Sequence, residues 1–181
     1  MKATGIVRRI DDLGRVVIPK EIRRTMRIKE GDPLEIFTDR EGEVIFKKYS
    51  PIGELSSFAA QYAETIHKIC DLSVVVCDRD AVVACAGVPK REFMDKSITA
   101  ELEQVIENRS FYQYSVGSVP FGVTGDAGYY VSCAMPIISE GDLIGCVCSV
   151  SDNGNQNNAP GETETKLIQT AANFLARQLE S

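Results

Sequence analysis

The most restrictive feature of this 181-residue chain is the spacing of short apolar segments between glycine, proline and charged turns in its first fifty residues. Pro19 suits the first position of a helix, because a proline there loses no hydrogen bond, and the helix is predicted from Lys20 to about Met26. Residues 39–42 are typical of a hairpin turn. The other elements are strands, predicted at residues 4–10, 15–18, 34–38 and 43–47. The predicted order is therefore β-β-α-β-β.

Fifty residues in this arrangement bury too little apolar surface to be comfortably stable alone. Disulfides and metal ions do not supply the missing stability, because none of the six cysteines forms a Cys-X-X-Cys pair and His67 is the sole histidine. We expect the cysteines to be buried free thiols that pack as small hydrophobes. The remaining remedy is oligomerisation, in which strands of two chains complete one core and form a body with two-fold symmetry.

Charge is divided unevenly along the chain. Residues 1–50 contain 12 lysines and arginines against 9 acidic residues, a net charge of +3, whereas residues 51–181 contain 8 against 17, a net charge of −9. This split indicates a basic binding module joined to an acidic one. No apolar run approaches the roughly 18 residues that span a membrane, and the N-terminus lacks a secretory signal. We therefore expect a cytoplasmic protein without a membrane partner.

The sequence LGRVVIP at residues 13–19, followed by EIRR at residues 21–24, resembles the DNA-binding domain of AbrB-type transition-state regulators of Gram-positive bacteria. The resemblance covers residues 1–50. It implies a β-rich swapped-hairpin dimer, in which two chains interleave their strands, and it implies double-stranded DNA as the partner. The family's DNA-contacting arginines correspond here to Arg8, Arg15, Arg23 and Arg24, and Arg9 lies where the family usually has a basic residue.

Elementary chemistry supports these five arginines as DNA-binding residues, because a guanidinium group can contact both phosphates and guanine edges. The competing interpretation is a solvated basic face without a ligand. For Arg15 a third possibility is an ion pair with Asp11 or Asp12.

Residues 50–53 break the strand pattern and mark the boundary of a second domain over residues 51–181. Apolar spacings of three and four predict helices over residues 54–70 and 162–180, and Ser97 is expected to cap a helix over residues 98–106. Strands are predicted at residues 72–78, 81–86, 129–138 and 143–150, a loop at residues 151–161, and no element is assigned to residues 108–127. This pattern predicts an α/β domain with an antiparallel sheet, and it resembles a GAF domain.

The second domain has no convincing catalytic or metal-binding constellation. A carboxylate pair such as Asp78 and Asp80 is explained by a turn. An effector of a GAF-like domain would bind between the sheet and the helices. The candidate pocket residues are equally explained as core packing; they are Tyr112, Tyr114, Phe121 and Cys133. We expect no cofactor and no enzymatic activity, and the small-molecule effector, if the domain has one, stays unidentified.

The two domains, in this order and length, resemble a two-domain member of the AbrB family. That resemblance implies a nucleoid-associated regulator of sporulation genes in the forespore of an endospore-forming bacterium. It also implies that paired GAF-like domains join two swapped dimers into a tetramer. The alternative is an antitoxin, since some antitoxins share the swapped-hairpin fold and bind DNA. Antitoxins usually append a short disordered tail, whereas residues 54–181 have the pattern of a folded domain.

Overall fold

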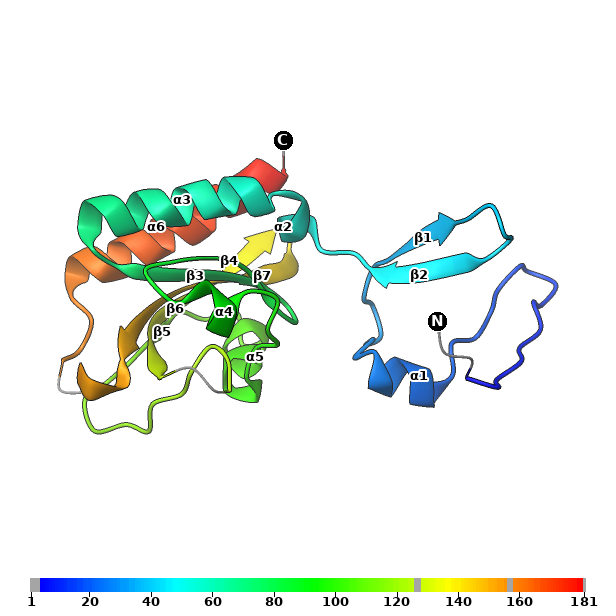
Figure 1. Cartoon of the computed structure of the whole chain (residues 1–181), viewed down its shortest axis with the longest axis horizontal. Helices are drawn as coiled ribbons and strands as arrows, with labels where there is room; N and C mark the ends of the chain where they lie inside the picture. Colours follow the sequence, from blue (N-terminus) through cyan, green and yellow to red (C-terminus); the bar gives the residue numbers. More distant parts are fainter. Residues whose placement is uncertain (1–3, 126–127, 156–157, 181) are drawn as a thin grey trace. The chain divides into compact units, whose positions relative to one another are not determined.

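The computed structural model describes residues 4–125, 128–155 and 158–180. The chain divides into two compact units, Met1–Tyr49 and Ser50–Ser181 (Figure 1). Within the described residues, no helix combines the length and the apolar character that crossing a membrane requires.

The first unit contains a short helix and a hairpin. The helix is α1 (Lys20–Thr25), and the hairpin pairs β1 (Leu34–Thr38) with β2 (Val44–Lys48) in antiparallel register. The hairpin turn follows the predicted chemistry, because the Asp39 carboxylate accepts backbone hydrogen bonds from Glu41 and Glu43. This hairpin is confirmed as predicted.

The strands predicted at residues 4–10 and 15–18 are absent from the single chain, so this prediction was wrong as stated. Both segments are irregular, and most of their apolar side chains are exposed, with Val7 at 86% and Val17 at 71%. A strand requires hydrogen bonds to a neighbouring strand, and neither segment has such a neighbour among the described residues of its own chain. The apolar pattern of these two segments therefore indicates side chains that favour burial, but it does not indicate whether the burial occurs within one chain or between two.

The second unit is built on a five-stranded antiparallel sheet with the order β4-β3-β7-β6-β5. Its strands are β3 (Ser73–Asp78), β4 (Val82–Ala86), β5 (Tyr112–Gln113), β6 (Tyr129–Ser139) and β7 (Asp142–Asp152). The two predicted hairpins, β3–β4 and β6–β7, are confirmed. The short strand β5 lies in the stretch left unassigned by the sequence, of which residues 126 and 127 are outside the described residues.

Helices cover both faces of this sheet (Figure 1). Alternate side chains of β3 show the division: Val74 and Val76 pack in one core cluster, while Val75 and Cys77 pack in the other. The first cluster includes buried residues of the long helices α3 (Ser56–Cys70) and α6 (Glu162–Leu179). The second includes residues of α4 (Lys90–Phe93) and α5 (Ala100–Glu107). This two-sided burial explains why β3 is a continuous apolar run rather than an alternating one.

Several predicted helix limits need correction. The helix predicted over residues 54–70 is preceded by a separate turn of helix, α2 (Pro51–Glu54), which Ser50 caps by accepting a hydrogen bond from the Gly53 amide at 3.2 Å. Ser97 does not cap α5, because Ser97 forms an isolated β-bridge with Ala81 and the cap is Thr99. The predicted loop at 151–161 contains a short 3₁₀ turn, Asn153–Asn155, and residues 156 and 157 are outside the described residues.

Candidate nucleic-acid interface

Helix α1 presents Arg23 and Arg24 from its last turn. The helix begins at Lys20. Pro19 occupies the N-cap position, whereas the sequence predicted it at the first helical position. It ends where Arg27 adopts a left-handed backbone (φ 51°), and the Ile28 amide then donates to the Arg23 carbonyl at 2.7 Å. Arginines in the last turn interact favourably with the negative end of the helix dipole. Both side chains are exposed.

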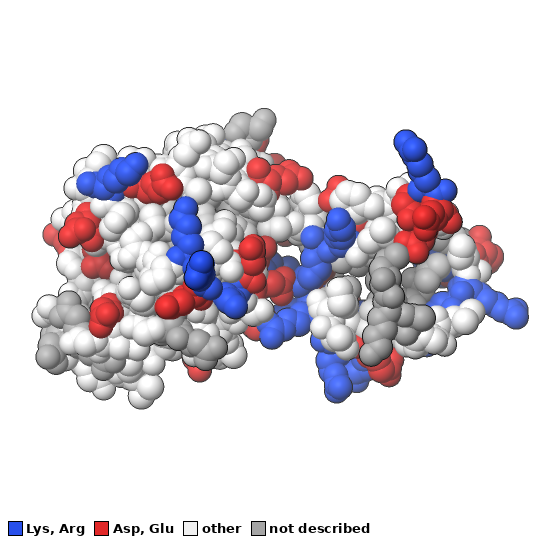
Figure 2. Space-filling model, in the orientation of Figure 1, with Lys and Arg blue, Asp and Glu red and all other residues white. Residues whose placement is uncertain are grey.

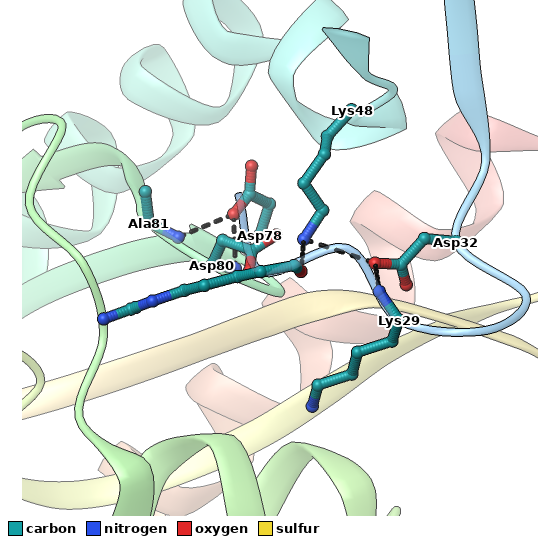
Figure 3. Close-up of polar contacts among 7 residues, drawn as sticks. Lys29, Asp32, Lys48, Asp78, Asp80 and Ala81 are labelled. Atoms are coloured by element: carbon teal, nitrogen blue, oxygen red, sulfur yellow. Dashed lines mark hydrogen bonds and ion pairs between the residues drawn. The ribbon is translucent and has the colours of Figure 1, made fainter. Parts of the chain in front are cut away.

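A small hydrogen-bonded corner holds the end of α1 against the hairpin (Figure 3). The Lys48 ammonium donates to the Arg27 carbonyl at 2.8 Å and lies 3.3 Å from an Asp32 carboxylate oxygen, which also accepts the Lys29 amide at 2.8 Å. No local sequence pattern predicts this corner, since it joins residues 21 positions apart. It positions the helix that carries Arg23 and Arg24.

Arg15 lies at the end of a tight turn that Asp11 organises. One Asp11 carboxylate oxygen, Oδ1, accepts the amides of Leu13 at 3.0 Å and Arg15 at 2.8 Å, and the other, Oδ2, accepts Arg15 Nε–H at 2.8 Å. These hydrogen bonds, chiefly those from Arg15, hold the pKa of Asp11 below its ordinary value. Gly14 takes the left-handed backbone (φ 75°) that closes the turn. Of the two carboxylates considered from sequence, Asp11 is therefore the partner of Arg15.

Arg8 and Arg9 lie on the irregular segment before this turn, and both are exposed. The five candidate arginines thus come from three places in one unit: the segment, the turn and α1. Apart from the Asp11–Arg15 pair, none of them forms an ion pair with another described residue. Figure 2 shows lysine and arginine side chains projecting from the surface of this unit, with acidic side chains among them.

The candidate pocket residues of the second unit are engaged in packing contacts with other side chains of that unit. Tyr114 is buried with its ring 4.8 Å from that of Tyr130, and the rings of Tyr112 and Phe121 are 4.9 Å apart. Cys133 is buried, and burial together with the nearby Glu164 carboxylate raises the pKa of its thiol to about 11. These contacts favour the core-packing interpretation that was left open by the sequence.

The carboxylate pair and the cysteines of this unit have roles in its turns and its core. Asp78 organises the β3–β4 turn, because one of its carboxylate oxygens accepts the amides of Asp80 at 2.8 Å and Ala81 at 2.7 Å (Figure 3). All six cysteines are free thiols and five are buried, as predicted, while Cys70 is half-buried. Within the part of the chain that is described, no group of histidine, cysteine or acidic residues is arranged to hold a metal ion.

The outer side of α6 has a shallow groove beside an aromatic cluster. Phe174 is 37% exposed, and its ring lies 5.3 Å from that of Tyr62 and 5.8 Å from that of Phe58, both on α3. The groove is lined by Lys166, Gln169, Thr170, Asn173, Phe174 and Arg177. By contrast, the alanines of both helices belong to the core that packs on the sheet; they are Ala59, Ala63, Ala171, Ala172 and Ala176.

Comparisons with known proteins cover both units. Residues 7–53 match the family described as antidote-toxin recognition MazE, bacterial antitoxin. Over 51 residues the chain is 63% identical to the transition state regulatory protein AbrB of Bacillus subtilis (strain 168), which is 28% of this chain and 52% of AbrB. The GAF domain of a phosphoenolpyruvate-protein phosphotransferase from Coxiella burnetii has a similar fold, with a TM-score of 0.51 and 15% identity over 70% of this chain and 82% of that one.

Two further matches extend over most of the chain and confirm the resemblance inferred from sequence. The chain is 52% identical over 183 residues to stage V sporulation protein T of Bacillus subtilis (strain 168), which covers 99% of both chains. Residues 54–180 match the family described as stage V sporulation protein T C-terminal, transcription factor. The chain therefore belongs to the stage V sporulation protein T family, with an AbrB-like N-terminal domain and a GAF-like C-terminal domain.

Proposed function

We propose that this protein regulates transcription by binding double-stranded DNA through arginines of its first unit: Arg8, Arg9, Arg15, Arg23 and Arg24. The observation that carries the proposal is the exposure of all five side chains on a unit whose net charge is positive. Four of them have no carboxylate partner among the described residues, so no internal charge competes with a phosphate. The same region is 63% identical to AbrB, a transition state regulatory protein.

The DNA-binding form in this proposal is a dimer with interleaved strands. Twelve large apolar side chains of residues 4–49 are exposed, against four of residues 50–180, and neither core cluster includes a residue of the first unit. So much exposed apolar surface on a small unit marks a surface of association. A second copy would cover it and would supply strand partners for residues 4–10 and 15–18.

In the cell, the proposed role is the control of sporulation genes. The support for it is the 52% identity to stage V sporulation protein T over nearly the whole chain. On this proposal the protein acts in the cytoplasm of the forespore, bound to the nucleoid, and it acts as a regulator rather than an enzyme.

For the second unit we propose self-association in preference to ligand sensing. Phe174 and the adjoining rings of α3 leave aromatic surface exposed, whereas Tyr112, Tyr114, Phe121 and Cys133 are engaged in packing. Pairing of this surface would join two swapped dimers into a tetramer. Light scattering tests it: a tetrameric full-length chain that becomes a dimer on Phe174→Glu supports the proposal, and a wild-type dimer contradicts it.

The alternative role is that of an antitoxin, which the match of residues 7–53 to MazE brings forward. That match covers only the first unit. Residues 50–181 form a compact folded unit rather than a tail, and they match a family of transcription factors. These observations favour the regulator.

Mapping of the bound sites across the genome of sporulating cells tests the proposed function. We expect bound sites at promoters of sporulation genes, and we expect those sites to be lost when Arg23 and Arg24 are both changed to alanine. Binding at the protein's own promoter alone, with co-purification of a ribonuclease, would support the antitoxin instead.

A further inference from the structure

Arg15 differs from the other four candidate arginines in having a carboxylate partner. Its Nε–H donates to Asp11 Oδ2 at 2.8 Å, while its backbone amide donates to Oδ1 of the same carboxylate. The side chain and the backbone of Arg15 are thus both fixed by one residue at the tip of one turn. None of the other four arginines is held by an ion pair within the described residues.

The hydrogen bond to Asp11 leaves the far end of the guanidinium group available. A guanidinium carries five N–H donors, and Asp11 uses only the one on Nε. The two terminal nitrogens have no hydrogen bond to a described residue, and the side chain is 69% exposed. Two parallel donors at the end of a fixed side chain match O6 and N7 of guanine in the major groove. Because Asp11 already restricts the side chain, less rotational freedom is lost when this contact forms.

Charge distinguishes a guanine contact from a phosphate contact. A phosphate is attracted by net positive charge, and the Asp11 carboxylate next to Nε offsets the charge of Arg15 and repels a phosphate. A guanine edge is uncharged, so the carboxylate does not oppose binding there. Arg8, Arg9, Arg23 and Arg24 have no carboxylate partner of this kind, which suits them to phosphates.

We propose that Arg15 is a specificity-determining residue that reads a guanine, and that Asp11 is the positioning residue that aims it. The other four arginines then supply affinity through the phosphate backbone. This inference rests on the proposed function, since it assumes that the first unit binds duplex DNA.

The test begins with a duplex selected from a random-sequence library by the full-length wild-type protein. Each guanine of that duplex is replaced in turn by 7-deazaguanine, which lacks the N7 acceptor. For the wild type we expect an affinity loss of about tenfold at one symmetry-related pair of guanines. For Arg15→Ala we expect no further loss at that pair. We also expect the slope of log affinity against log salt to stay within about 0.5 of the wild-type slope, since no phosphate contact is removed.

Asparagine substitutions of Asp11 and of its neighbour Asp12 test whether Asp11 positions Arg15. Asp11→Asn keeps an oxygen that can accept the Leu13 and Arg15 amides, but it replaces the acceptor of Arg15 Nε–H by a donor. Asp12→Asn makes the same change of charge one residue away, at a side chain without a hydrogen bond or ion pair to another described residue. We expect Asp11→Asn, and not Asp12→Asn, to weaken the dependence on the same guanine pair. Asp11→Asn should also steepen the salt slope, by up to about 2 units per dimer, as two arginines become available to phosphates.

Each alternative outcome overturns a defined part of the inference. If Arg15→Ala flattens the salt slope by about 2 units and binding depends on no guanine, Arg15 is a phosphate contact. If Asp11→Asn and Asp12→Asn behave alike, Asp11 does not position Arg15. A wild-type protein that selects no duplex and binds none would instead overturn the proposed function itself.

Discussion

The double substitution of Arg23 and Arg24 by alanine is the most direct test of whether α1 binds DNA. Both side chains are exposed in the last turn of the helix and have no ion pair with another described residue. Alanine is the best helix former, which offsets part of the favourable interaction with the helix dipole that the two arginines lose. The corner that holds the end of the helix uses the Arg27 carbonyl and the Lys48 ammonium, which the substitution does not touch. The variant therefore removes charge and little else.

The expected magnitude follows from counterion release. Each phosphate neutralised by a basic side chain contributes about 0.9 to the slope of log affinity against log salt. Two arginines on each of two chains make four such contacts in the proposed dimer, so the slope should flatten by about 3.6 units. Across the fourfold rise from about 50 to about 200 mM salt, that difference amounts to about 150-fold in affinity. The variant should consequently be far weaker than the wild type at low salt and much closer to it at high salt.

Equilibrium binding by fluorescence anisotropy over this salt range measures the slope directly. Arg40→Ala is the control, because it removes one arginine per chain from an exposed position in the turn of the hairpin, outside the candidate set. We expect the control to change the slope by less than about 0.5 unit. A double variant whose slope equals that of Arg40→Ala would refute the assignment of Arg23 and Arg24 to phosphates.

Three further results are expected. A fragment of residues 1–50 should unfold with a midpoint that rises with protein concentration, because the unit lacks a core of its own; a concentration-independent midpoint would argue against the interleaved dimer. Gly145→Ala should lower the free energy of unfolding of the second unit by about 3 kcal/mol in urea denaturation, because the added Cβ collides with the Cys77 backbone carbonyl. The control is Gly161→Ala, whose added Cβ meets no atom within 4 Å, and it should lower the free energy of unfolding by about 1 kcal/mol or less. A thiol reagent should label one cysteine rapidly per folded chain, and Cys70→Ser should abolish that signal, since the other five thiols are buried; rapid labelling that survives the substitution would contradict this burial.

The elements that could be predicted best from the sequence are those in which periodicity and burial agree. The two hairpins of the second unit and the long helices α3 and α6 appear close to the predicted places, since their apolar residues face a core within the same chain. The short elements were missed because few residues define them. Strand β5 has two residues and helix α4 has four, and both depend on neighbours that are distant in sequence. Ser97 and Thr99 are both suitable caps by type, and only the bridge between Ser97 and Ala81 decides between them.

In the first unit the turn residues and the exposed arginines could be predicted from the sequence, whereas the partners of the strands and of Arg15 could not. The turn residues Asp11 and Gly14 and the exposed arginines of α1 lie as expected, because local rules determine a turn and the end of a helix. Whether Arg15 pairs with Asp11 or with Asp12 was not decided, since both carboxylates precede the turn and only the backbone conformation brings one of them to Nε. The segments at 4–10 and 15–18 have the pattern of strands, but a pattern cannot provide the partner strand.

The contrast in burial between the two units has a consequence for regulation. The second unit buries two apolar clusters within one chain, so it can fold without a partner, whereas the first unit keeps twelve large apolar side chains exposed. In the proposed dimer, folding of the first unit would be coupled to association, and the population of the folded unit would depend on the local concentration of a second chain. Self-association of the second unit would raise that local concentration through the covalent link between the units. Anything that strengthens or weakens contacts at Phe174 would therefore change DNA binding without touching an arginine. Phe174→Glu should accordingly weaken DNA binding most at low protein concentration. Equal weakening at all concentrations would show that association of the second unit does not promote association of the first.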